Sequence, residues 1–340
     1  MSGIAEATGI TYDDVKQAAD RIAGQVRPVS VALADPAGAS GPGPELWLAL
    51  EHLQYTGSFK ARGAQNFLRA HHAAGTLPDA GVTIASGGNA GLACAWAARQ
   101  HSVRATVFLP ETAPPVKVAR LRSYGAEVRL TGSTYGEALA ACGEFGATTG
   151  ALSSHAYDHP LIAAGAGTLM EEIHAHLPEL DTVVVSVGGG GLFTGVATAA
   201  LHHGVRVVAV EPEHCRALNA ALEAGRVVDS PVDSVASDSL GATRASAMAL
   251  ETAGREGVRS VLVPDSAITA ARQALWDGHR IAVEHAASTA LAALTAGAAD
   301  DGAGAGDGRY GYRPAPGERI CVVLCGANTD LTTLVRGTDT

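Results

Sequence analysis

The sequence is poor in lysine and in aromatic residues. Phe, Trp and Tyr together make up only 4% of it. Only three of its 24 basic residues are lysines, namely Lys16, Lys60 and Lys117, so arginine carries almost all of the positive charge. An arginine stays protonated and cannot condense with an aldehyde, whereas a lysine amine can. Each retained lysine is therefore a candidate for amine chemistry, although chance retention is the simpler explanation for any one taken alone.

Other absences exclude whole classes of protein. No apolar run reaches the roughly 18–20 residues needed to cross a bilayer, and the start, MSGIAEATGITYDDVK, lacks the regions of a signal peptide. The five cysteines are irregularly spaced, which argues for a reducing compartment and against a disulfide framework. A net charge of −10 argues against nucleic acid or an anionic membrane as the main partner. We expect a cytoplasmic enzyme or metabolite-binding protein.

What the sequence does contain is an alternation of short β-branched runs and alanine-rich helical stretches. This alternation predicts an α/β fold, in which open, mostly parallel sheets are covered by helices on both faces. The predicted strands span residues 46–50, 82–85, 105–109, 127–130, 182–187, 205–210, 260–263 and 320–325. The predicted helices span residues 90–100, 115–124, 135–146, 165–176 and 194–203. Residues 297–319 are rich in Gly, Ala and Pro and predict a long surface loop.

Lys60 lies in the stretch QYTGSFKARGA (54–64), between a predicted strand and a helix. Ser58 is expected to cap this helix, which puts the amine of Lys60 in the first turn. The positive end of the helix dipole disfavours the ammonium form and makes the neutral nucleophile more available. The alternative is an ordinary solvated lysine at a helix start.

Two glycine-containing turns, each between a strand and a helix, are candidate anion sites. In ASGGNAGLACAWAARQ (85–100), Gly87 and Gly88 allow a carboxylate or phosphate to approach the free N–H groups of the helix start. A plain strand–helix turn is the alternative there. In VVVSVGGGGLFTGVATAA (183–200), four consecutive glycines make a stronger candidate for a phosphate cradle.

The tetraglycine stretch does not fit two well-known nucleotide-binding motifs. Its glycine spacing matches a P-loop, but Val196 occupies the lysine position. The dinucleotide fingerprint fails because Phe193 or Thr194 stands at its last glycine, although Glu211 lies at about the distance of the ribose-binding acid. Nicotinamide binding is therefore disfavoured.

A fourth stretch, ICVVLCGANTD (320–330), is a buried strand that ends in Cys325, which by itself reads best as a small core residue. Taken together and in order, however, the four stretches closely resemble the fold type II pyridoxal-phosphate (PLP) enzymes, in particular the serine/threonine dehydratase family, from about residue 46 to 330. The resemblance implies two domains of tryptophan synthase β type, each an open, twisted, mostly parallel sheet with helices on both faces. The large PLP-binding domain would comprise residues 1–79 and 157–340, and a small domain, residues 80–156, would be inserted into it.

The resemblance also implies a role for each motif residue. Lys60 matches the lysine that forms the internal aldimine with PLP, and Phe59 matches the residue that packs on the pyridine ring. Asn89 matches the side chain that bonds the phenolic oxygen, and Cys325 takes the position opposite the pyridine nitrogen. The residues matching the phosphate cradle are Gly188, Gly189, Gly190, Gly191 and Leu192. Those matching the loop for the substrate carboxylate are Ser86, Gly87, Gly88 and Asn89, with Ser86 also a catalytic candidate, and residues 154–168 resemble a stretch that lines the active site.

The family chemistry implied for this chain is β-elimination. A neutral Cys325 thiol cannot keep the pyridine protonated, which suits loss of a β-hydroxyl better than transamination. Lys60 would remove the Cα proton and the cofactor phosphate would protonate the departing hydroxyl. We expect a PLP-dependent ammonia-lyase for L-threonine or L-serine that yields a 2-oxo acid and ammonia. The alternatives are β-replacement, elimination on a substrate such as 3-hydroxyaspartate, and a non-catalytic amino-acid-binding relative; residues 237–246 leave the β-side-chain specificity open.

The sequence departs from the family pattern S-[SA]-G-N-H at Gly87 and Ala90. Serine racemases of this fold use a serine at the position of Gly87 as a second acid/base, so we expect racemisation not to be the main activity. Cation-binding members use the acid matching Glu211 and another about six residues later, where this chain has Ala217. We therefore expect no metal, although Glu211 with Glu213 remains a candidate. The resemblance further implies a homodimer without the regulatory domain of biosynthetic threonine deaminases.

Overall fold

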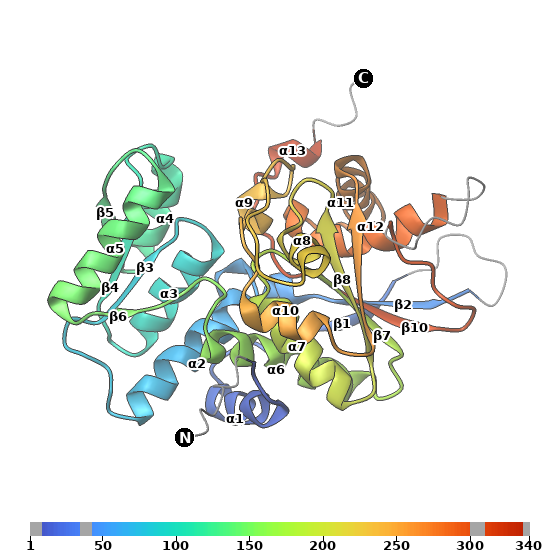
Figure 1. Cartoon of the computed structure of the whole chain (residues 1–340), viewed down its shortest axis with the longest axis horizontal. Coiled ribbons are helices and arrows are strands. Elements are labelled where there is room, and N and C mark those ends of the chain that lie inside the picture. The colour runs from blue at the N-terminus through green and yellow to red at the C-terminus, as the bar shows by residue number, and fades with distance from the viewer. Residues whose placement is uncertain (1–8, 35–42, 300–309, 336–340) are drawn as a thin grey trace.

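The computed structural model describes residues 9–34, 43–299 and 310–335, and its strands form two separate sheets (Figure 1). The strands are β1 (Val31–Leu33), β2 (Glu45–Ala49), β3 (Val82–Ala85), β4 (Ala105–Leu109), β5 (Glu127–Leu130), β6 (Leu152–Ser153), β7 (Thr182–Ser186), β8 (Arg206–Pro212), β9 (Val258–Val263) and β10 (Arg319–Val323). The six-stranded sheet has the order β1-β2-β10-β7-β8-β9, and the four-stranded sheet has the order β5-β4-β3-β6. Within these sheets only the β1–β2 pairing is antiparallel, which confirms the predicted α/β fold with two mostly parallel sheets.

Helices follow most of the strands and cover both sheets. They are α1 (Tyr12–Ile22), α2 (Lys60–Ala73), α3 (Asn89–Gln100), α4 (Pro115–Ser123), α5 (Tyr135–Thr149), α6 (Pro160–His176), α7 (Gly191–His202), α8 (Ala217–Ala224), α9 (Ser237–Leu240), α10 (Ala247–Ala253), α11 (Asp265–His279), α12 (His285–Ala299) and α13 (Thr332–Val335), with short 3-10 turns η1 (Glu51–Leu53) and η2 (Tyr55–Gly57). In the described part of the chain, no helix is long and apolar enough to span a bilayer.

The four-stranded sheet is built from residues 82–153 and has a hydrophobic cluster on each face. Ile84 and Val107 belong to a large cluster that includes α3, whereas Ala85 and Phe108 pack with Cys142 of α5. Successive residues of a strand point to opposite faces. The alternation in these strands therefore places α3 and α5 on opposite sides of the sheet.

The six-stranded sheet has the larger core, and its central strands are the most buried. All residues of β7 are buried, which explains why this strand has an apolar run rather than an alternating pattern. Helices α1, α6 and α7 lie on one side of the sheet, and α11 and α12 lie on the other (Figure 1). The sheets occupy separate lobes, so loops after the strands of each sheet can face those of the other.

The predicted elements agree with the structure to within a few residues, with several exceptions. The strands β1 and β6 and the helices α8 to α13 were not predicted. The two strands and the helices α9 and α13 are too short to show a period, and alanine-rich helices such as α8 and α12 have too little polar contrast. Helix α12 extends to Ala299, into the loop predicted for residues 297–319. Residues 300–309 of that loop lie outside the described residues.

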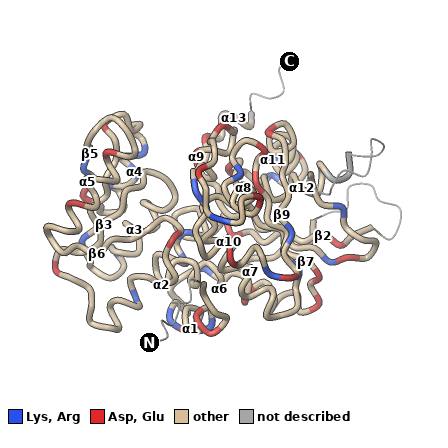
Figure 2. Tube along the Cα trace, viewed as in Figure 1, with Lys and Arg blue, Asp and Glu red and all other residues tan. Residues whose placement is uncertain are grey.

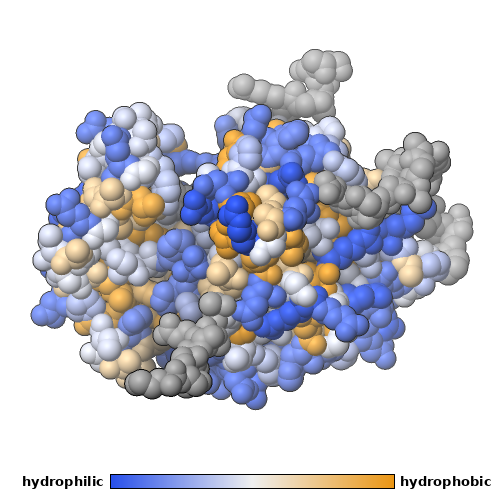
Figure 3. Space-filling view, viewed as in Figure 1, coloured by the Kyte–Doolittle hydropathy of each residue, from blue (hydrophilic) through white to orange (hydrophobic). Residues whose placement is uncertain are grey.

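Charge of both signs is distributed over both lobes. Basic and acidic residues are interspersed along the described chain (Figure 2). The face in Figure 3 is mainly hydrophilic, with small hydrophobic groups among the polar residues. Along the described trace in Figure 2, basic and acidic residues alternate instead of gathering by sign.

Candidate active site

One cavity of about 590 Å³ lies where β3, β7 and β10 end and where α2 begins. Four stretches that are far apart in the sequence therefore meet at one place, as expected for the carboxyl ends of parallel strands. The residues predicted to bind cofactor or substrate all line it: Phe59, Lys60, Ser86, Gly87, Gly88, Asn89, Gly188, Gly189, Gly190, Gly191, Leu192 and Cys325.

The amine of Lys60 points into this cavity from the first residue of α2. Its Nζ donates a hydrogen bond of 2.6 Å to the carbonyl oxygen of Ala156 and lies 4.7 Å from the centre of the Phe59 ring. Burial lowers the pKa of Lys60 to about 8, against the opposing effects of Cys325 and Glu284. A substantial fraction of the amine is thus neutral near pH 8, as a nucleophile or base requires.

The start of α2 is fixed differently from the prediction, because Ser58 does not cap it with its side chain. The backbone of Ser58 is extended and forms an isolated bridge with Gly326, while its hydroxyl is buried and makes no hydrogen bond within the described chain. The N–H of Phe59 donates to the carbonyl oxygen of Cys325 at 3.0 Å. Backbone pairing to the end of β10, rather than a side-chain cap, therefore sets where α2 begins.

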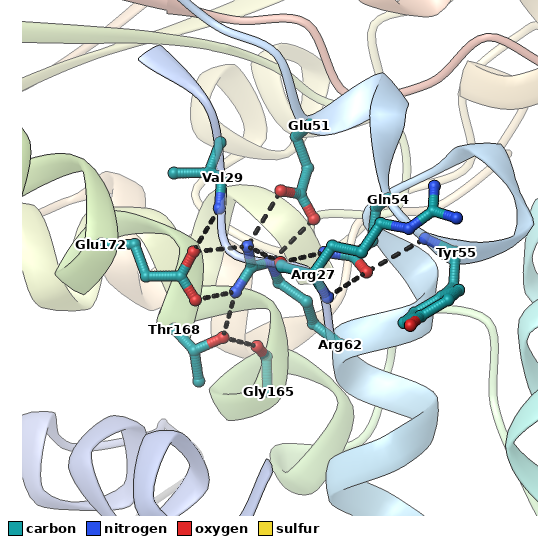
Figure 4. Close-up of polar contacts among 9 residues, drawn as sticks. All are labelled: Arg27, Val29, Glu51, Gln54, Tyr55, Arg62, Gly165, Thr168 and Glu172. Carbon is teal, nitrogen blue, oxygen red and sulfur yellow. Dashed lines mark hydrogen bonds and ion pairs between the residues drawn. The ribbon is translucent and has the colours of Figure 1, made fainter. Parts of the chain in front are cut away.

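A buried arginine holds α2 against its surroundings (Figure 4). Arg62 donates to Glu51 at 2.7 and 3.0 Å and to Glu172 at 2.7 and 2.9 Å, and its Nη1 lies 3.2 Å from Thr168 Oγ1. The side chains of Arg62 and Glu51 are 0% and 1% exposed. This network joins α2 to η1 and α6, and so fixes the helix that presents Lys60.

The tetraglycine loop has no room for side chains. A Cβ at Gly189 would lie 2.3 Å from the ring of Tyr157, and one at Gly191 would lie 2.7 Å from the Tyr157 carbonyl oxygen. Gly190 has a φ of 102°, and its Cβ would meet Ala249 at 2.3 Å. The loop thus presents bare backbone at the start of α7, where free N–H groups and the helix dipole favour an anion. These residues fit a phosphate group.

The turn from Ser86 to Asn89 presents a second helix start. Helix α3 begins at Asn89, and its N-cap, Gly88, supplies no side-chain cap. A Cβ at Gly91 would lie 1.9 Å from the carbonyl oxygen of Ser86, and one at Gly87 would lie 2.8 Å from Leu109. Small residues therefore keep the N–H groups of this turn open to the cavity, which fits a carboxylate.

Cys325 follows β10 in the six-stranded sheet and lines the cavity. It is 2% exposed, and its Sγ lies 3.6 Å from the hydroxyl oxygen of Ser186. Burial raises the pKa of the Cys325 thiol to about 12, with a smaller contribution from Glu284. The thiol carries no charge at neutral pH, as the predicted position opposite a pyridine nitrogen requires.

Three residues that line the site, Glu284, Asn328 and Tyr157, were given no individual role from the sequence. Asn89 donates from Nδ2 to both oxygens of Glu284, at 2.9 and 3.1 Å, and accepts from Asn328 Nδ2 at 2.6 Å. Tyr157 walls the tetraglycine loop, within the stretch predicted to line the site. Glu284 had one signal, a single acid between the apolar residues IAV and an alanine-rich helix, but no local pattern showed what it faces.

Glu211 has a structural role instead of a place in the cavity. Its carboxylate accepts from the backbone N–H groups of Leu218 and Asn219 at 2.8 and 2.7 Å, at the start of α8. Burial raises the pKa of Glu211 to about 8. Across residues 9–34, 43–299 and 310–335, no group of three or more His, Cys, Asp and Glu is placed to hold a metal.

Comparison with known proteins agrees with this geometry. The pattern of the family described as "Pyridoxal-phosphate dependent enzyme" matches residues 31–326. The chain is 35% identical over 294 residues to the L-threonine ammonia-lyase of Geobacter sulfurreducens, covering 86% of this chain and 69% of that protein. It is 38% identical over 259 residues to the Homo sapiens protein named serine dehydratase-like, covering 75% and 78%. The structure of maize serine racemase matches with a TM-score of 0.84 and 26% identity, covering 96% of both chains. The chain therefore belongs to the fold type II family of enzymes that depend on pyridoxal phosphate.

Proposed function

We propose that this protein is an ammonia-lyase that removes the β-hydroxyl and the amino group of L-threonine or L-serine, giving a 2-oxo acid and ammonia. The observation that carries the proposal is that the Lys60 amine and the neutral Cys325 thiol line one cavity, together with two open helix starts. The names of two relatives, an L-threonine ammonia-lyase and a serine dehydratase-like protein, support the same reaction.

PLP, when bound, supplies the electron sink for breaking the Cα–H bond. Lys60 would carry the cofactor, and its Nζ, which has a pKa of about 8, is suited to accept the Cα proton near neutral pH. The carbonyl oxygen of Ala156 orients that Nζ through a 2.6 Å hydrogen bond. The Cys325 thiol stays neutral, so it would give the ring nitrogen of a bound cofactor no counter-charge, which would favour loss of the leaving group.

The remaining groups would bind and orient. The backbone of residues 188–192 would hold the cofactor phosphate at the start of α7, and Phe59 would pack on the ring. The N–H groups and hydroxyl of the turn from Ser86 to Asn89 would hold the substrate carboxylate at the start of α3. Residues 80–156 would form the inserted small domain, since all strands of the four-stranded sheet fall within them.

Racemisation is the second candidate, because the maize serine racemase has a closely similar fold. A racemase needs a second acid or base on the opposite face of the substrate, and Gly87 offers no side chain at the position we predict for it. The space there is also limited, since a Cβ at Gly87 would approach Leu109 to 2.8 Å. This favours elimination over racemisation.

We further propose a homodimer in the cytoplasm. All five cysteines are free and buried, which supports a reducing compartment. The dimer rests on the resemblance to the family, and sedimentation or light scattering of the purified protein tests it. A monomeric mass at micromolar concentration contradicts it.

The cofactor and substrate assignments are tested on the purified protein. We expect a visible absorption band, and borohydride reduction should attach the cofactor to the peptide that contains Lys60. Lys60→Arg should lose both the linkage and 2-oxo acid release, whereas the control Lys16→Arg, on α1, should retain them. Linkage or turnover that survives Lys60→Arg refutes the central proposal.

The substrate is tested separately by measuring 2-oxo acid and ammonia from L-serine, L-threonine and 3-hydroxyaspartate. Release from serine or threonine supports the proposal. A coloured protein that acts only on 3-hydroxyaspartate, or on none of the three, retains the cofactor assignment and refutes the substrate assignment.

A further inference from the structure

Glu284 is a buried carboxylate that the mechanism above does not use. It lies just before α12, lines the cavity, and is only 6% exposed. Its backbone N–H donates to the carbonyl oxygen of Gly326, and a Cβ at Gly326 would come within 2.3 Å of its Oε1. Gly326 therefore leaves room for this carboxylate because it has no side chain. Burying a charge is costly, so a carboxylate kept here points to a role for it.

The carboxylate ends a chain of side-chain hydrogen bonds. Glu284 accepts from Asn89 Nδ2, and Asn89 Oδ1 accepts from Asn328 Nδ2 at 2.6 Å. Asn328 Nδ2 also donates to the Thr56 carbonyl oxygen at 2.8 Å, and Asn328 Oδ1 accepts from Arg120. This series of hydrogen bonds runs along the cavity wall from α4 through α3 to the start of α12.

The groups at the two ends of this series of hydrogen bonds fix the orientation of the side-chain amides of Asn89 and Asn328. An ionised carboxylate and a peptide carbonyl can only accept hydrogen bonds, while a guanidinium can only donate them. Asn328 must therefore direct Nδ2 toward Thr56 and Oδ1 toward Arg120. Asn89 must direct Nδ2 toward Glu284, since the opposite orientation would bring its Oδ1 against the carboxylate. A donor at this point is what an anionic oxygen of a ligand in the cavity would need.

Glu284 also affects the charge state of the Lys60 amine. It opposes the effect of burial on Lys60, so its charge favours the ammonium form. The ionisable groups that face Glu284 in turn are Lys60, Cys325 and Asp238. Burial raises the pKa of Glu284 to about 7, while the hydrogen bonds from Asn89 and Ser239 lower it.

We propose that Glu284 is a positioning residue, whose carboxylate holds Asn89 Nδ2 as the donor beside the cavity and supplies a negative charge to the cavity that the Lys60 amine also lines. This inference rests on the proposed cofactor site, because it gives that site its donor toward an anionic oxygen. The carboxylate acts through Asn89 and Lys60.

The first test reads the Lys60 amine directly and needs neither cofactor nor turnover. The full chain labelled with carbon-13 at the lysine ε position has three labelled side chains, and Lys60→Arg assigns the signal of Lys60. Glu284→Gln should lower the pKa of Lys60 by about one unit, the scale of a nearby opposite charge. The matched control is Glu318→Gln, which removes a carboxylate that is 5% exposed but lies outside the cavity, and it should leave that pKa unchanged. An unchanged pKa in Glu284→Gln overturns the electrostatic half of the proposal.

The second test reads cofactor retention in the holoenzyme. Glu284→Met, which removes the acceptor, and Asn89→Ala should each weaken retention of PLP about tenfold, which is the effect of losing one hydrogen bond. In the double variant the two losses should not multiply, because Glu284 acts through Asn89. Losses that multiply to about a hundredfold refute the positioning role, and retention equal to that of the unchanged enzyme in Glu284→Met refutes it as well.

Glu284→Asp separates charge from reach and covers the case in which Glu284→Gln fails to fold. It keeps the charge but withdraws it from Asn89, so the Lys60 pKa should stay within a few tenths of a unit while PLP retention falls. A large fall of the Lys60 pKa in this variant contradicts the proposal. A protein that never binds PLP, with the Lys60 pKa still dependent on Glu284, instead refutes the proposed function and leaves the electrostatic link intact.

Discussion

Replacing Arg62 by Met should destabilise the protein far more than the loss of an ordinary ion pair. Arg62 is fully buried and is shared by Glu51, which is 1% exposed, and Glu172, which is 31% exposed. Arg62→Met leaves the Glu51 carboxylate without its cation in a site that water cannot reach. Removing one partner of a buried pair costs about 3–5 kcal/mol, so we expect a loss of that size in the free energy of unfolding.

The measurement is chemical unfolding followed by circular dichroism and tryptophan fluorescence. The double variant Arg62→Met with Glu51→Leu should recover most of the loss, because an apolar pair replaces the stranded charge and Glu172 can turn to water. The control is Arg244→Met, which breaks an ion pair whose side chains are 62% and 65% exposed, and it should change little. A loss below about 1 kcal/mol for Arg62→Met, or a double variant as unstable as the single one, refutes this reasoning.

Three further predictions follow from the site and its surroundings. Gly189→Ala should reduce PLP retention at least tenfold, because the added methyl group would lie 2.3 Å from the ring of Tyr157. The control Gly88→Ala places its methyl group in open space and should fold normally. Equal PLP retention in the two variants contradicts the proposed phosphate cradle. Burial lowers the pKa of His52 to about 4, so the unfolded chain binds more protons than the folded one between about pH 4 and 6.5. Stability should therefore fall as the pH drops through that window, and His52→Gln should fall less steeply in an unfolding titration. Ser58→Ala should cost nothing measurable in thermal unfolding, because the hydroxyl makes no cap; a loss near 1 kcal/mol, typical of a removed cap, would restore the side-chain cap that the sequence predicted.

The sequence predicted the fold and the residues around the cavity because the relevant signals are local. A strand that runs into glycines and then a helix is visible in a dozen residues, as at Gly188 to Leu192. Where such turns follow parallel strands, the topology brings them together without further information. The roles of these residues toward the cofactor stay predictions.

Contacts between distant segments could not be predicted in the same way. Glu284 and Asn89 are 195 residues apart, and neither stretch shows a period or motif that names the other. The prediction of a side-chain cap at Ser58 is wrong for the same reason, since a backbone bridge between Ser58 and the distant Gly326 fixes the start of α2 instead. Glu211 has the chain position of a ligand-binding acid, yet its carboxylate serves the backbone of α8.

The pairing of Phe59 with Cys325 has a consequence for the order in which the protein is made. Strand β10 lies between β2 and β7, so the last strand of the chain completes the centre of the sheet. Lys60 is synthesised long before residues 319–326. Until those residues leave the ribosome, the carbonyl group of Cys325 that anchors the start of α2 is missing. An unfinished chain therefore holds its reactive amine without the pocket around it, and competence for the cofactor arrives only near the end of synthesis.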